Sequence, residues 1–115
     1  MTTIRLMMPP AKLSPNGTRN RMERHRLAQK YKSDCFHLAR GAGVRPISAE
    51  GIKMTLTFHP ATNRRRDLDN LIAAFKSGQD GLSLAFDVDD SLFDVTHILG
   101  DVTPGGAVIV EVSAR

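Results

Sequence analysis

The segment RRRDLDN, residues 64–70, carries the strongest candidate chemistry in the sequence. Asp67 and Asp69 are two positions apart, directly after three arginines, and Asn70 closes the segment. A helix beginning here could use Asp67 as its N-cap and place Asp69 near the positive end of the helix dipole, without any catalytic role. The arginines already supply counter-charge, so the paired carboxylates also suit a divalent metal ion beside a phosphate. A charged helix start, a structural ion cluster and a metal–phosphate site all stay open at this point.

A second acidic segment, FDVDDS, follows at residues 86–91 and contributes three more carboxylates: Asp87, Asp89 and Asp90. Mg²⁺ binds one or two carboxylates, keeps several waters and takes its remaining ligands from a substrate phosphate. Such an ion stabilises the charge that develops on a phosphodiester during hydrolysis. Asn70 could then hold a carboxylate or a metal-bound water, and Lys76, on the helix face that starts at Asp69, could reach the scissile phosphate.

The separation of the two acidic segments is an objection to a single site. A straight helix of about 20 residues is about 30 Å long, so it would hold them at its opposite ends. Two arrangements would remove the objection. The helix breaks at Gly78–Gly81 and folds back, or a partner subunit supplies the missing acids.

The charges are strongly segregated along the chain. Residues 1–66 contain 14 Lys and Arg against three acids, a net +11, whereas residues 67–115 carry a net −7. Such asymmetry favours a polyanionic partner. The single cysteine, Cys35, is typical of a small buried thiol and of a reducing cytoplasm. No membrane span, signal peptide, EF-hand loop, Gly-rich phosphate loop or nucleophile elbow is found in the sequence.

The hydrophobic periodicity predicts one domain over residues 1–115, of the α+β class. We expect strands at 3–8, 52–58, 91–99 and 106–114, and helices at 18–42 and 67–86, the second weakened near Gly78. Pro104-Gly105-Gly106 suggests an antiparallel hairpin between the last two strands. The resulting order is β-α-β-α-β-β: a small mixed sheet of about four strands with two main helices, both on one face.

The motifs RRRDLDNL and VDDS, with LSPNG and a basic helix upstream, resemble those of the RusA family of Holliday junction resolvases, which are frequent in phages. The resemblance covers about residues 13–93. It implies a homodimeric, Mg²⁺-dependent endonuclease of the cytoplasm, with Mn²⁺ as a substitute ion, that makes paired nicks across a four-way DNA junction in recombination and repair. It assigns the metal ligands to Asp67, Asp69 and Asp90, with Asn70 and Asp89 supporting them. The family's lysine one turn beyond the paired acids is replaced by Ala73, and Lys76 would take its part.

The same resemblance implies which residues contact DNA. Arg64, Arg65 and Arg66 would bind the phosphates that flank the cut. A duplex arm would follow the basic residues of the first helix, with Asn16 in the loop before it: Arg19, Arg21, Arg24, Arg26 and Lys30. Two alternatives are a non-catalytic DNA-binding protein of the same fold and a nuclease for other branched DNA, such as flaps or forks.

Overall fold

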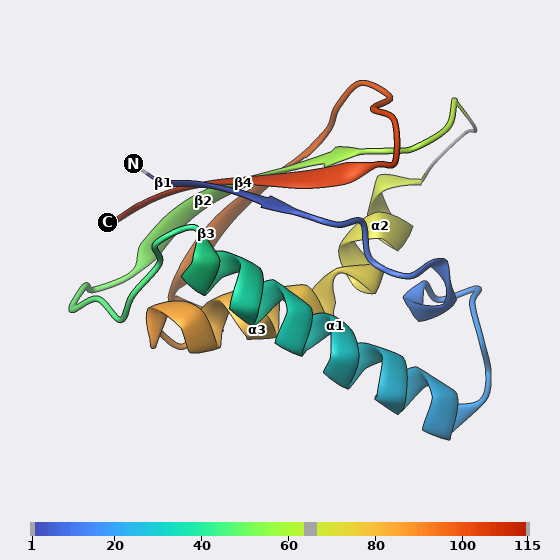
Figure 1. Ribbon diagram of the computed structural model, residues 1–115, viewed down its shortest axis with the longest axis horizontal. Coiled ribbons are helices and arrows are strands. Elements are labelled where there is room, and N and C mark those ends of the chain that lie inside the picture. Colours follow the sequence, from blue (N-terminus) through green and yellow to red (C-terminus); the bar gives the residue numbers. More distant parts are fainter. Residues whose placement is uncertain (1, 64–66, 115) are drawn as a thin grey trace.

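A four-stranded sheet with three α-helices against one face forms the described part of the protein, residues 2–63 and 67–114 of a computed structural model (Figure 1). The elements are β1 (Thr2–Leu6), α1 (Arg21–Gly41), β2 (Ile52–His59), α2 (Leu68–Ala74), α3 (Lys76–Phe86), β3 (Phe93–Leu99) and β4 (Ala107–Ala114). Short 3₁₀ turns occupy Ala11–Leu13 and Asp90–Leu92. The predicted α+β class and the four-stranded mixed sheet are confirmed, but the second predicted helix is divided into α2 and α3.

The predicted hairpin between the last two strands is wrong. The strand order is β1-β4-β2-β3, so β4 pairs antiparallel with both β1 and β2, while β3 pairs parallel with the other side of β2. The loop between β3 and β4 crosses the end of β2, where Gly100 N–H donates to Phe58 O (2.9 Å) and Thr103 N–H to Pro60 O (2.9 Å). A strand with neighbours on both sides suits the apolar run of β4, which buries Val108, Val110 and Val112.

The alternation predicted for the strand at 52–58 is confirmed. Four side chains of β2 are at most 2% exposed and face the helices: Ile52, Met54, Leu56 and Phe58. Phe75, between α2 and α3, contacts Phe58 edge to face, with 5.7 Å between ring centroids, and contacts Tyr31 of α1 in the same way at 6.1 Å. These aromatic contacts connect the sheet, α1 and the junction between α2 and α3.

Helix α1 begins three residues later than predicted because Asn20 is its N-cap. The Asn20 Oδ1 atom accepts the backbone N–H of Glu23 at 2.9 Å. Cys35 on this helix is fully buried, and burial raises the pKa of its thiol to about 12, so the thiol stays protonated at neutral pH. Neither α1 nor any other helix in the described ranges has the length and apolar character that crossing a membrane requires.

The predicted helix break lies at Phe75 rather than at the glycines. Helix α3 runs through Gly78 and Gly81, and both are buried against α1. A Cβ atom on Gly78 would come within 2.8 Å of the Tyr31 ring, and one on Gly81 would overlap the carbonyl oxygen of Lys32. These glycines therefore permit the close approach of two helices, instead of weakening one.

His97 on β3 should make stability depend on pH. Its ring is stacked on Phe58, and partial burial lowers its pKa below the ordinary 6.5, because the imidazolium ion is disfavoured there. The unfolded chain binds a proton at His97 more tightly than the folded chain does. The stability contributed by the neutral imidazole is therefore complete above pH 6.5 and is lost as the pH falls through the folded-state pKa. We expect His97→Phe to reduce the fall in Tm between about pH 7.5 and about pH 5. His25→Phe, an exposed position on α1, is the control and should leave the wild-type fall unchanged.

Candidate active site

The acidic turn at residues 67–70 opens α2. Asp67 is the N-cap residue, and its Oδ1 atom accepts the backbone N–H of Asp69 at 3.0 Å. Both carboxylates are exposed, and neither forms an ion pair with any residue in the described ranges. The capping role considered for Asp67 is therefore confirmed, while its second oxygen and the Asp69 carboxylate face solvent. The three arginines, Arg64, Arg65 and Arg66, lie outside the described residues.

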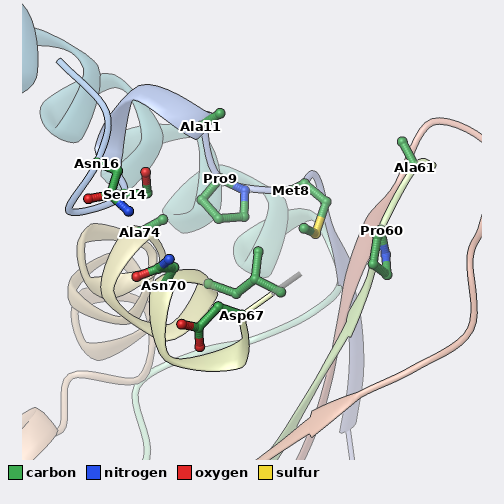
Figure 2. Close-up of a pocket in the computed structure, with 11 residues that line it drawn as sticks. Met8, Pro9, Ala11, Ser14, Asn16, Pro60, Ala61, Asp67, Asn70 and Ala74 are labelled. Atoms are coloured by element: carbon green, nitrogen blue, oxygen red, sulfur yellow. The ribbon is translucent and has the colours of Figure 1, made fainter. Parts of the chain in front are cut away.

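The acidic turn borders a cavity of about 450 Å³. Asp67 and Asn70 approach it from α2, and Asn16 approaches it from the loop that follows the first 3₁₀ turn (Figure 2). Met8 and Pro9, after β1, and Pro60, after β2, complete its walls. The fold thus brings together the LSPNG and DLDN segments, which lie far apart in the sequence. The apolar walls were not foreseen, because only the charged and amide side chains of this region were considered in the sequence.

The second acidic segment forms a different part of the surface. Asp89 caps the 3₁₀ turn Asp90–Leu92, and the Ser91 N–H that it accepts at 2.9 Å lowers the pKa of its carboxyl group. Asp89 and Asp90 line a shallow hollow of about 210 Å³ together with Asp80 and Lys32. Asp89 therefore serves as a turn cap, and both Asp89 and Asp90 border this separate hollow.

Within one chain, the two acidic segments do not meet. Helix α2 and the end of α3 lie at opposite ends of the helix layer in Figure 1. No group of three or more His, Cys, Asp and Glu in the described ranges could hold a metal ion. The break at Phe75 does not fold α3 back toward Asp67. Of the two arrangements considered from the sequence, only acids supplied by a partner subunit would unite Asp90 with Asp67 and Asp69.

Lys76 does not share a helix face with Asp69. Helix α2 ends at Ala74, and Lys76 is the first residue of α3. The exposed Lys76 borders a third hollow, of about 240 Å³, whose other lining residues include Ala73 and Asp80. The predicted reach of Lys76 toward the acidic turn relied on one continuous helix, which is not formed, so its catalytic role stays a prediction.

Comparison with known proteins identifies a relative of this chain, but the name of that relative describes no activity. No protein-family model matches the sequence. The chain is 30% identical over 118 residues to an uncharacterized protein of Xylella fastidiosa, a match that covers 98% of this chain and 76% of that protein. The chain belongs to the family of this Xylella protein. Because the relative's name states no activity, the function of this family member has to be inferred from its own site.

The basic end of α1 extends beyond the sheet in this member of the family (Figure 1). Three predicted DNA-binding residues at or just before this end of the helix are exposed and form no hydrogen bond or ion pair within the described ranges: Arg19, Arg21 and Arg26. Lys30 is also exposed but forms an ion pair with Asp34 at 2.8 Å. A surface pair of this kind contributes little to stability, so Lys30 can exchange it for another anion.

Arg24 differs from the exposed basic residues of the first half of α1 because its guanidinium is bound to backbone carbonyls. It donates to the carbonyl oxygens of Leu13 (3.0 Å), Ser14 (3.0 Å) and Thr18 (2.8 Å). These three carbonyls surround the loop that carries Asn16. Arg24 therefore positions one wall of the cavity, a role that its place in a run of exposed basic residues does not indicate.

We expect Arg24→Ala to lower the free energy of unfolding by about 2 kcal/mol, because three backbone acceptors lose a charged donor. The same variant should be cut faster by proteases within residues 11–18. Arg26→Ala, an exposed neighbour on the same helix, should change stability by less than about 0.5 kcal/mol. Denaturant unfolding of both variants measures this difference. An Arg24→Ala variant with wild-type stability and weakened DNA binding would instead make Arg24 a phosphate ligand.

Proposed function

We propose that this protein is a Mg²⁺-dependent endonuclease for branched DNA that resolves four-way junctions by paired nicks and acts as a homodimer. The observation that best supports the proposal is the cavity shared by Asn16, Asp67 and Asn70. The resemblance to RusA resolvases rests in part on the same two segments, LSPNG and DLDN, and its third segment, VDDS, lies elsewhere in the chain. The meeting of LSPNG and DLDN at one cavity is what a common active site requires and is not dictated by either segment alone.

The donor set on α2 suits Mg²⁺ or Mn²⁺. Asp67 and Asp69 provide two exposed carboxylates, which is the number that Mg²⁺ commonly takes from protein when a phosphate and water complete its shell. A bound ion would supply charge stabilisation for the phosphodiester and a more acidic bound water. Asn70, one residue further along α2, would orient a carboxylate, and Asp90 of the partner subunit would complete the acidic set.

The exposed arginines at the start of α1 provide the DNA-binding surface of the proposal. Arg19, Arg21 and Arg26 would contact backbone phosphates without reading bases, and Arg64, Arg65 and Arg66 would do so beside the cut. Binding should therefore weaken steeply with salt, by a slope of about −0.9 for each phosphate neutralised on a logarithmic plot. Selectivity for junctions would come from the shape of the DNA.

A non-catalytic DNA-binding protein is the second candidate. The observation that favours it is the local use of two of the acids as caps, Asp67 on α2 and Asp89 on the 3₁₀ turn. In that case the basic surface would bind branched DNA and the carboxylates would serve only the fold.

Purified protein incubated with an end-labelled four-way junction, and with a linear duplex of the same arm sequence, tests the proposal. With Mg²⁺ we expect paired nicks in the junction at symmetric positions and an intact duplex. Labelled flaps and forks in parallel reactions test the other branched substrates. Binding of the junction without any cleavage in Mg²⁺ or Mn²⁺ would favour the non-catalytic candidate.

A further inference from the structure

The side chains that line the cavity beside the acidic turn are apolar or neutral, apart from one carboxylate. Among the described residues that line it, none is a lysine or arginine, and Asp67 contributes a negative charge. Its other polar side chains are neutral: Ser14, Asn16 and Asn70. These side chains offer hydrogen bonds rather than positive charge, which suits a neutral group that both donates and accepts hydrogen bonds.

The two amides in the lining are free to bind such a group. Within the described part of the chain, neither the Asn16 nor the Asn70 side chain has a hydrogen-bond partner. Each amide presents a donor and an acceptor in one plane, the arrangement that matches the edge of a nucleobase. They come from different segments, so a flat ligand between them could be contacted on two edges.

The remaining walls suit the faces of a flat ring. Pro9 and Pro60 are buried, and Met8 and Leu71 are partly buried around the same space. The prolines are rigid, so this part of the cavity is formed before any ligand arrives. A volume of about 450 Å³ falls within the usual range for small-molecule sites. Apolar side chains with a few polar groups at the edge are also how enzymes hold an extruded base.

We propose that this cavity receives the base of a nucleotide next to the cleaved phosphate, unstacked from its duplex arm. The inference rests on the proposed endonuclease function and adds a base-binding subsite to it. The cavity adjoins Asp67, so a base held there would fix the neighbouring phosphate against the acidic turn. A junction is a favourable substrate, because stacking is already interrupted at its branch point and a base there is more easily extruded.

Fluorescence of 2-aminopurine tests for the unstacked base. The analogue is placed at each position around the mapped cut in turn, and the junction is bound in Ca²⁺ to hold cleavage back. We expect a fluorescence increase of several-fold at a position adjoining the cut and little change elsewhere. Two variants address the cavity: Asn16→Ala removes one amide, and Ala61→Trp fills the mouth from an exposed position. Ala42→Trp, at an exposed alanine after α1, is the matched control.

Both cavity variants should lose the fluorescence increase and cut about tenfold more slowly, while the junction affinity of Ala61→Trp stays within about twofold of wild type. The control should match wild type in all three measurements. If the wild type binds and cuts junctions but no position becomes brighter, the base-binding inference is wrong and the endonuclease proposal stands. If the wild type binds but never cuts, the endonuclease proposal fails and the inference falls with it.

Discussion

Asp69→Asn is expected to slow junction cleavage at least about a hundredfold, because several kcal/mol of charge stabilisation are lost with the carboxylate. The substitution keeps the shape of the side chain. It also leaves the fold intact, since Asp69 is exposed and only its backbone N–H takes part in the cap on α2. Junction binding should stay within about threefold of wild type, because the phosphate contacts come from the basic residues. Single-turnover cleavage and a gel-shift titration of the same preparation measure the two effects.

Asp94→Asn is the matched control for this substitution. Asp94 is an exposed aspartate on β3, on the sheet face away from the helices. Asp94→Asn therefore changes the net charge by the same amount as Asp69→Asn. Cleavage by this variant should be unchanged. Wild-type cleavage by Asp69→Asn in Mg²⁺ would show that the metal assignment on α2 is wrong.

Gly81→Ala is expected to cost about 3 kcal/mol of the free energy of unfolding, at the upper end for an overpacked core position. The added methyl group would meet the Lys32 carbonyl of α1, and a backbone atom cannot move aside as a flexible side chain can. The gain of up to about 1 kcal/mol in helix propensity does not offset this collision. For a domain of this size the loss should lower Tm by roughly 10 °C or more.

Gly41→Ala provides the comparison, because it makes the same chemical change at the end of α1. No atom lies within 4 Å of the Cβ that it would add. This variant should be neutral or more stable by up to about 1 kcal/mol. Equal stability of the two variants would mean that α1 and α3 do not cross closely at Gly81. Calorimetry or chemical denaturation distinguishes these outcomes.

Local patterns predicted the elements of the fold better than their arrangement. The alternation in β2 and the helical spacing in α1 depend on neighbours in the sequence, and both predictions are confirmed apart from the ends of the elements. The position of β4 between β1 and β2 depends on which strands offer free edges, and the turn residues Pro104-Gly105-Gly106 carry no information about that. The glycines of α3 were misinterpreted for a similar reason. Glycine is found both where a helix breaks and where two helices pack closely, and the sequence does not distinguish the two cases.

The candidate site was predicted in part. The acidic turn lies at the start of a helix, as the sequence indicated, and Asn16 adjoins it. The distance objection was justified, because Asp90 lies on a separate hollow of the same chain. The positioning role of Arg24 could not be foreseen. Its side chain has the same type and spacing as the exposed arginines around it, and only the folded loop supplies the carbonyls that it contacts.

The strand order also bears on how the protein is made. Among the described strands, β1 pairs only with β4, so it finds its partner strand only after residues 107–114 have been synthesised. At about 5–20 residues per second, β1 remains without its partner strand for several seconds. Pairing over so long a separation closes a large loop and is slow. Nascent β1 is thus where a holdase chaperone would be of most use, and shortening the chain before Ala107 would leave that strand permanently without a neighbour.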